Sequence, residues 1–203
     1  MIKCVSFDLQ GTITESDFCD SLWINIIPRI YALRKNISEQ EAKIEIKNIY
    51  GENAIYNLKY YDDNYWTKML EFNAIEELEK IGKKPKIDGQ FIEIIKNLKT
   101  KKIIISTTTN LFINTELGKE AQYFDKLYSC VDYFKIGGKT PEVFIKVAKE
   151  LNLKPQEILH IGDNYIMDIE NAKKAGVNTI HFNGNTDETI NKIKEYLEGK
   201  VNV

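Results

Sequence analysis

Short apolar runs alternate with helical patterns over most of this chain. Five runs have the length and apolar content of β-strands, and several are apolar at consecutive positions, which favours strands covered on both faces, as in a parallel sheet. These runs are residues 3–8, 102–106, 127–131, 158–162 and 178–182. Residues 140–151 predict a helix, since their apolar positions recur at helical spacing behind Thr140 and Pro141. The alternation of strand and helix from residue 88 onward predicts an α/β domain with a doubly wound, Rossmann-like parallel sheet.

Residues 14–86 interrupt this alternation. They contain no clear strand pattern, and they carry several helical patterns rich in isoleucine, tyrosine and tryptophan. One of these patterns begins with a capping box formed by Ser38 and Glu41. We therefore expect an all-helical cap domain over residues 14–86, inserted into an α/β core domain made of residues 1–13 and 87–203.

Composition indicates the class of protein and excludes some partners. The chain has 203 residues, 43% of them hydrophobic and 29% charged, which is typical of a soluble globular protein. Its net charge of -2 gives no electrostatic reason to expect nucleic acid or a membrane surface as a partner. The three cysteines, Cys4, Cys19 and Cys130, lack metal-ligand spacing and favour a reducing compartment. With no signal-peptide pattern and no apolar stretch of membrane-spanning length, we expect a cytoplasmic protein, either monomeric or homodimeric.

Carboxylates and hydroxyls stand where three of the predicted strands end. Asp8 closes the first run, Ser106 and Thr107 lie at the end of the second, and Asp163 follows the fourth. Ligands bind at the carboxyl ends of the strands in open α/β sheets, so these side chains are expected to converge if the strands are neighbours. Asp168, about one turn further on, is expected to face the same point. Carboxylates that share a site repel one another unless a cation neutralises them, and hard oxygen ligands favour Mg²⁺ beside a substrate phosphate.

One lysine is placed to complete such a site. Lys139 stands between the third and fourth strand runs, directly before the predicted helix start at Thr140 and Pro141. A lysine at this point can neutralise a bound phosphate and the carboxylates near it. The alternative interpretation, a solvated loop lysine, is common in a chain so rich in lysine.

Four segments of the chain resemble motifs I to IV of the haloacid dehalogenase-like hydrolase superfamily, in the same order. They are "FDLQGT", the "IIIST" strand end, "GGKTPEVF" and "ILHIGDNYIMDIENAKKAG". The helical insertion occupies the place of that family's helical cap, so the resemblance implies a phosphatase-type member with a cap after the first strand. It covers the α/β core and implies covalent phosphoryl transfer to a small phosphorylated substrate.

The resemblance implies a role for each matching residue. Asp8 is expected to be the nucleophile, Ser106 or the adjacent Thr107 to hold a phosphoryl oxygen, and Lys139 to stabilise the transferring group. The implied Mg²⁺ ligands are Asp8, the backbone carbonyl of Gln10, Asp163 and Asp168. Gly11 permits the turn beside the substrate, and Arg29 of the insertion is a candidate partner for a substrate carboxylate, although a surface position is the more usual place for an arginine.

Gln10 departs from the family pattern. Phosphatases of this family usually carry a second aspartate there, which protonates the leaving oxygen and then activates water. An amide can donate a hydrogen bond but is neither an acid nor a base, and losing a general acid–base costs on the order of 10²–10⁴ in rate. On this interpretation Gln10→Asp should raise turnover.

Three functions remain open from the sequence. The leading hypothesis is a Mg²⁺-dependent phosphatase that forms an aspartyl-phosphate on Asp8 and whose activity is reduced by Gln10. The second is a catalytically impaired protein that binds phosphate and metal. The third is a metal-independent 2-haloacid dehalogenase, which Asp163 and Asp168 disfavour because their arrangement makes best sense with a cation.

Overall fold

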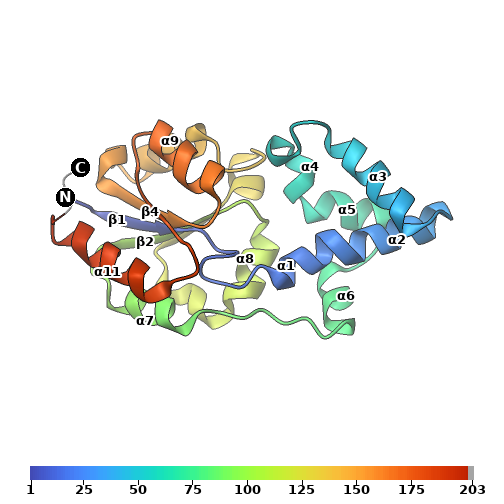
Figure 1. Ribbon diagram of the computed structural model, residues 1–203, viewed down its shortest axis with the longest axis horizontal. Helices are drawn as coiled ribbons and strands as arrows, with labels where there is room; N and C mark the ends of the chain where they lie inside the picture. Colours follow the sequence, from blue (N-terminus) through green and yellow to red (C-terminus); the bar gives the residue numbers. More distant parts are fainter. Residues whose placement is uncertain (201–203) are drawn as a thin grey trace.

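The computed structural model describes residues 1–200 and contains a parallel sheet of five strands in the order β3-β2-β1-β4-β5 (Figure 1). The strands are β1 (Cys4–Phe7), β2 (Lys101–Ser106), β3 (Lys126–Ser129), β4 (Ile158–Gly162) and β5 (Asn178–His181). All five coincide with the predicted apolar runs to within one or two residues at each end. The predicted α/β class with a Rossmann-like parallel sheet is confirmed.

Helices cover both faces of the sheet, as the continuous apolar runs predict. Figure 1 shows α9 on one face and α7 and α11 on the other. The core helices are α7 (Gly89–Asn97), α8 (Asn110–Leu117), α9 (Pro141–Glu150), α10 (Asn171–Lys174) and α11 (Thr186–Leu197). Shorter helical turns join them: η3 (Gly118–Tyr123), η4 (Cys130–Phe134), η5 (Pro155–Glu157) and η6 (Tyr165–Glu170).

Successive residues of β2 show why the strands are apolar throughout. Ile104 packs into the hydrophobic cluster that contains Phe91 of α7. Its neighbours Ile103 and Ile105 pack into the opposite cluster, with Phe144 of α9. Because side chains alternate across a strand and both faces are covered, every position in the middle of the sheet is buried.

Residues 17–80 form a separate helical lobe beyond the carboxyl ends of the strands (Figure 1). Its elements are α1 (Asp17–Ser21), η1 (Leu22–Ile26), α2 (Ile27–Lys35), α3 (Glu39–Tyr50), η2 (Ala54–Tyr56), α4 (Leu58–Tyr61), α5 (Asp63–Leu70) and α6 (Ala74–Lys80). The lobe has a hydrophobic cluster around the fully buried Trp66, and Phe112 of α8 joins this cluster from the core. The capping box predicted at the start of α3 is present, with Ser38 and Glu41 exchanging hydrogen bonds.

The helical lobe joins the core through two adjacent segments of chain and touches it again at the far side. The entering and leaving segments pair antiparallel at Thr14 and Ile87. At the far side, a Cβ on Gly137 would lie 2.5 Å from the carbonyl oxygen of Tyr56. Only a glycine therefore allows the lobe to approach the core this closely.

No helix within residues 1–200 is both long and apolar enough to cross a lipid bilayer. The three cysteines are free and buried, and they pack as small apolar core residues.

Candidate active site

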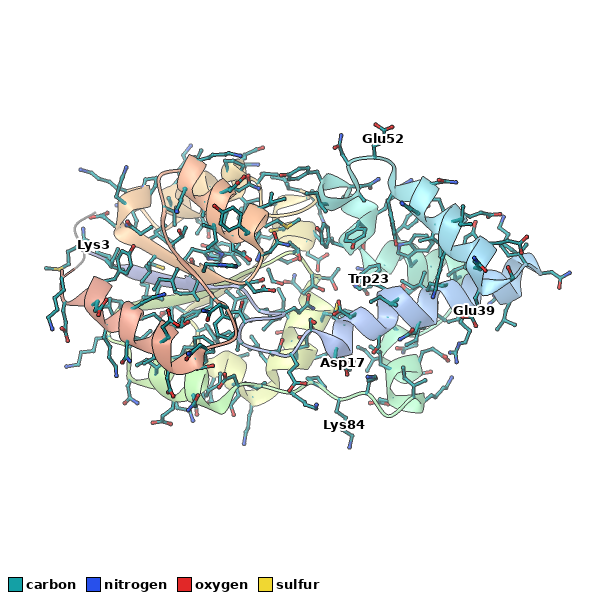
Figure 2. All side chains as sticks on the ribbon, in the orientation of Figure 1. Lys3, Asp17, Trp23, Glu39, Glu52 and Lys84 are labelled. Atoms are coloured by element: carbon teal, nitrogen blue, oxygen red, sulfur yellow. The ribbon has the colours of Figure 1, made fainter. Side chains whose placement is uncertain are left out.

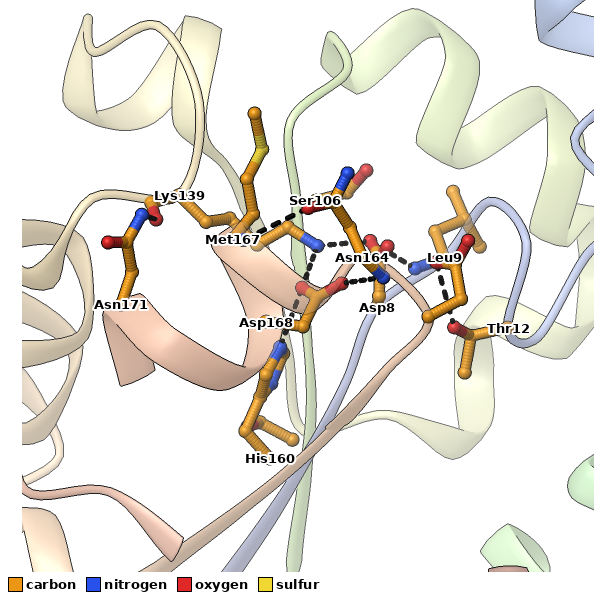
Figure 3. A network of polar contacts seen from close by, with 12 residues as sticks. Asp8, Leu9, Thr12, Ser106, Lys139, His160, Asn164, Met167, Asp168 and Asn171 are labelled. Carbon is orange, nitrogen blue, oxygen red and sulfur yellow. Dashed lines mark hydrogen bonds and ion pairs between the residues drawn. The ribbon is translucent and has the colours of Figure 1, made fainter. Parts of the chain in front are cut away.

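The candidate residues meet at one edge of the sheet because their strands are neighbours. β1 lies between β2 and β4, so the residues that follow these three strands emerge side by side. One oxygen from each of Asp8, Asp163 and Asp168 lies within 4.8 Å of the others. Lys139 reaches the same point from the loop before α9 (Figure 3).

Asp8 is held by two donors. Its side chain is almost fully buried, the backbone N–H of Leu9 donates to Oδ1 at 2.7 Å, and Lys139 Nζ lies 2.7 Å from the same oxygen. The geometry thus fixes one carboxylate oxygen and orients the other.

Asp168 positions Lys139. Its Oδ1 pairs with Lys139 Nζ and lies 3.0 Å from His160 Nε2, and its Oδ2 accepts from the backbone N–H of Asn164 at 2.9 Å (Figure 3). His160 is in turn 2.8 Å from the hydroxyl of Ser6 through Nδ1. Both Asp168 oxygens are therefore engaged by protein groups. This predicted ligand is in the cluster, but its contacts are those of a residue that holds the lysine in place.

Asp163 lies against the turn that follows Asp8. Gly11 has a φ of +79°, and a Cβ there would lie 2.5 Å from Asp163 Oδ2. Thr12 donates a long hydrogen bond to the other carboxylate oxygen of Asp163 at 3.5 Å. Gly11 therefore permits the turn and leaves room for the carboxylate of Asp163.

The charges of the site do not balance among protein groups alone. Burial raises the pKa of Asp8, and the Asp168 and Asp163 carboxylates raise it further against the opposing effect of Lys139. Burial also raises the pKa of Asp168, but Lys139 and His160 outweigh it and hold that pKa below its ordinary value. Three carboxylates face one ammonium, so a further cation would balance the remaining negative charge. The donor set of hard oxygens fits Mg²⁺, with Asp8 and Asp163 as the side chains best placed to hold it.

The two hydroxyls left open by the sequence differ in position. Ser106 is fully buried, and its Oγ accepts from the backbone N–H of Thr108 at 3.3 Å. Thr107 and Thr108 line the cavity at the site, whereas Ser106 lies behind its wall. The geometry therefore favours Thr107 for contact with a ligand, and it adds Thr108, which the sequence analysis did not single out.

Gln10 has a partner that no motif indicated. Its amide Nε2 donates to Glu116 Oε1 at 2.6 Å, and Thr14 Oγ1 donates to Glu116 Oε2 at 2.6 Å. Glu116 lies on α8 and is 2% exposed. Burial raises its pKa to about 7, although the two hydrogen bonds oppose the shift. The amide nitrogen is therefore turned toward Glu116, and the amide oxygen of Gln10 has no hydrogen-bond partner among residues 1–200.

A cavity of about 290 Å³ opens between this cluster and the helical lobe. Its core wall includes Asp8, Gln10 and Lys139. Its lobe wall is formed by side chains of the first helices and of the segment around α4; these are Cys19, Asp20, Trp23, Ile24, Ile55, Tyr60 and Tyr61. Figure 2 labels Trp23 on the first helices of the lobe.

The structure does not bring Arg29 to this cavity. Its guanidinium pairs with Glu77 of α6 at 2.6 Å, and the residue borders a different hollow of the lobe, beside α2 and α3. Arg29 therefore lies away from the cavity, because α2 presents it to another lobe helix.

Comparisons with known proteins concern the family and the fold of this chain. A model of the family described as haloacid dehalogenase-like hydrolase matches residues 2–176. Enolase-phosphatase E1 of Sulfurihydrogenibium sp. is 29% identical over 206 residues, covering 90% of this chain and 88% of that protein. The GMP/IMP nucleotidase YrfG of Escherichia coli is 22% identical over 80% of this chain and 75% of its own length. The chain matches a Plasmodium yoelii cyclic nucleotide phosphodiesterase over only 22% of that protein's length.

Among solved structures, a phosphatase of Thermococcus onnurineus superposes with a TM-score of 0.75 at 22% identity. The match covers 98% of this chain and 99% of that one. At this identity the likeness is evidence for the shared fold.

Proposed function

The chain belongs to the haloacid dehalogenase-like hydrolases, and we propose that it is a Mg²⁺-dependent phosphatase that acts on a small phosphorylated metabolite through an aspartyl-phosphate on Asp8. The single observation that carries this proposal is the position of Lys139, buried between Asp8 and Asp168 at the base of the cavity. A buried lysine shared by two carboxylates, with a third carboxylate nearby, is an arrangement suited to a bound phosphoryl group and a cation.

In the first step Asp8 is the nucleophile. Leu9 N–H and Lys139 hold its Oδ1, so we assign the attack on phosphorus to Oδ2. The bond from Oδ2 to phosphorus forms as the bond from phosphorus to the ester oxygen breaks, and that oxygen leaves with the electron pair. Lys139 and Thr107 are the groups we assign to the charge on the phosphoryl oxygens. Mg²⁺, when bound by Asp8, Asp163 and the Gln10 carbonyl, supplies further charge neutralisation at the phosphoryl group.

In the second step water attacks the phosphorus of the aspartyl-phosphate, the bond from phosphorus to Asp8 Oδ2 breaks to restore the carboxylate, and the proton of the water passes to the departing phosphate or to solvent. The amide oxygen of Gln10 can accept a hydrogen bond from that water and orient it, but it cannot take the proton. We therefore expect slow turnover on ordinary alkyl phosphates, and faster turnover when the leaving group needs no proton.

We propose that the helical lobe acts as the cap of this site and contacts the leaving group. Support comes from the cavity, whose outer wall is built from lobe residues. The three free and buried cysteines support our proposal of a cytoplasmic location.

A second candidate is a catalytically impaired protein that binds phosphate and a metal. Gln10 favours it, because the amide removes the usual proton-transfer group. The intact set of Asp8, Lys139 and Asp163 argues against it, since binding alone needs no nucleophile. A metal-independent dehalogenase is the weaker alternative, because the acidic cluster makes best sense with a cation.

Phosphate release on a panel of phosphate esters and acyl phosphates, with and without Mg²⁺, tests the proposal. We expect release by the wild type with Mg²⁺ only, and none from Asp8→Asn. Failure of the wild type on the whole panel would reject the phosphatase, and release of halide from haloacids without metal would support the dehalogenase.

A further inference from the structure

The lobe wall of the cavity has an unusual charge for a site that takes phosphorylated compounds. Asp20 is the one charged side chain that the lobe contributes to the wall within the described residues. On the core side Lys139 is the one cation in the wall over the same residues, and it already pairs with Asp8 and Asp168. A leaving group with a carboxylate or a second phosphate would meet no free cation here and would face the carboxylate of Asp20.

Three aromatic side chains lie in the same lobe wall, beside Cys19, Ile24 and Ile55. The rings of Trp23 and Tyr60 are nearly parallel, with an interplanar angle of 6° and centroids 6.4 Å apart. Tyr61 meets Tyr60 edge-on with centroids 4.8 Å apart. All three line the cavity, and aromatic faces carry negative quadrupole charge that attracts cations.

Asp20 is available to a ligand and close to these rings. Its side chain is exposed, and none of the ion pairs within residues 1–200 uses it. Burial raises the pKa of Tyr60, and the Asp20 carboxylate raises it further, in keeping with their shared place in the wall. A cationic leaving group in the cavity can pair with this carboxylate, whereas a neutral one cannot.

We propose that the cavity selects phosphate monoesters whose alcohol carries a positively charged nitrogen, with the nitrogen against Trp23 and Tyr60 and with Asp20 as its counter-ion. This inference rests on the proposed phosphatase function for the placing of the phosphate at Asp8 and Lys139. The phosphate end and the ammonium end of such a compound meet opposite walls of one cavity, each with the complementary charge.

The test compares substrates of nearly equal shape and different charge. Phosphocholine carries the cation, 3,3-dimethylbutyl phosphate has the uncharged carbon isostere of its alcohol, and the phosphate ester of 3-hydroxypropionate carries a carboxylate. We expect kcat/KM for phosphocholine to exceed that for the isostere by about 10-fold, with the anionic compound poorest, since cation–π contacts and a counter-ion act together.

Substitutions then test whether Asp20 produces the preference for phosphocholine. Asp20→Asn should reduce the preference for phosphocholine over the isostere to less than about 3-fold. Asp17→Asn is the matched control: it makes the same charge change on the same helix, but Asp17 pairs with Lys83 and lies outside the cavity wall. It should keep the wild-type preference.

A binding measurement keeps the inference separate from the phosphatase proposal. If the wild type releases no phosphate, the same compounds are titrated into it calorimetrically with Mg²⁺, because an inert protein does not consume them. Tighter binding of phosphocholine than of its isostere, lost in Asp20→Asn, would support the cation site even as the phosphatase proposal failed. The inference would be overturned if the neutral or the anionic compound were used or bound as well as phosphocholine, or better. It would also be overturned if phosphocholine did not bind, or if Asp20→Asn kept the wild-type preference.

Discussion

Restoring the usual acid at position 10 should fail unless Glu116 is changed with it. In the wild type, Gln10 Nε2 donates to Glu116 Oε1 at 2.6 Å in a buried contact. Gln10→Asp replaces this donor by a carboxylate that is one methylene shorter, which places two carboxylates about 4 Å apart. At that separation two unit charges repel by about 4 kcal/mol with an effective dielectric constant of about 20.

That repulsion is equivalent to about 3 pKa units, so the pair should retain a proton near neutral pH. The retained proton would lie on Glu116, whose pKa burial already raises to about 7, and the Glu116 hydroxyl would draw the new carboxylate toward α8 and away from the cavity. The double variant Gln10→Asp/Glu116→Gln removes the repulsion, because the amide introduced on α8 can donate to the new aspartate and still accept from Thr14.

Steady-state phosphate release at pH 7 with Mg²⁺ checks this reasoning on the wild type, both single variants and the double variant. We expect little or no gain from Gln10→Asp alone and a gain of about 10²-fold in kcat for the double variant, within the usual range for a general acid–base. A full gain from the single variant would refute the role assigned to Glu116. No gain from the double variant would show that the missing aspartate does not limit turnover.

Three further predictions concern stability and activity. Burial raises the pKa of Glu116 from 4.5 to about 7, so stability that is complete below pH 4.5 should be lost as pH rises through 7, by about 3 kcal/mol. Glu116→Gln should remove this loss, measured as the difference from the wild type in urea unfolding between pH 5 and 8, and parallel curves would refute it. Gly137→Ala should destabilise the protein by about 1–3 kcal/mol and raise KM, because the new Cβ meets the Tyr56 carbonyl at 2.5 Å; an unchanged melting temperature and KM would contradict the close contact. Arg29→Gln should leave kcat/KM within about 2-fold and cost less than about 1 kcal/mol, since Arg29 pairs with Glu77 away from the cavity; a large loss of activity would return Arg29 to the site.

The sequence predicted those parts of the site that depend on strand ends. Asp8 and Asp163 follow strands that are neighbours in a parallel sheet, so one topological rule is enough to bring them together. The fold class followed in the same way, because consecutive apolar residues in β2 indicate cover on both faces.

Contacts made across the fold could not be predicted in this way. Glu116 lies 106 residues from Gln10, and nothing in the sequence around α8 distinguishes it from an ordinary surface glutamate. Which of Ser106 and Thr107 faces the cavity depends on the exact residue at which β2 ends, and the sequence does not determine this end to a single residue. The direction of Arg29 depends on how α2 packs against the other lobe helices, which helical periodicity alone does not determine.

The central claim is that Asp8 becomes phosphorylated during turnover. The most direct measurement is acid quenching of the protein during reaction with acetyl phosphate and Mg²⁺, followed by mass spectrometry of its peptides. Acetate leaves without needing a proton and Gln10 cannot serve as a base for the attacking water, so the phosphoenzyme should accumulate. The account predicts a phosphoryl group on the peptide that contains Asp8, absent without Mg²⁺ and in Asp8→Asn. No label in the wild type, or a label on any other residue, would contradict it.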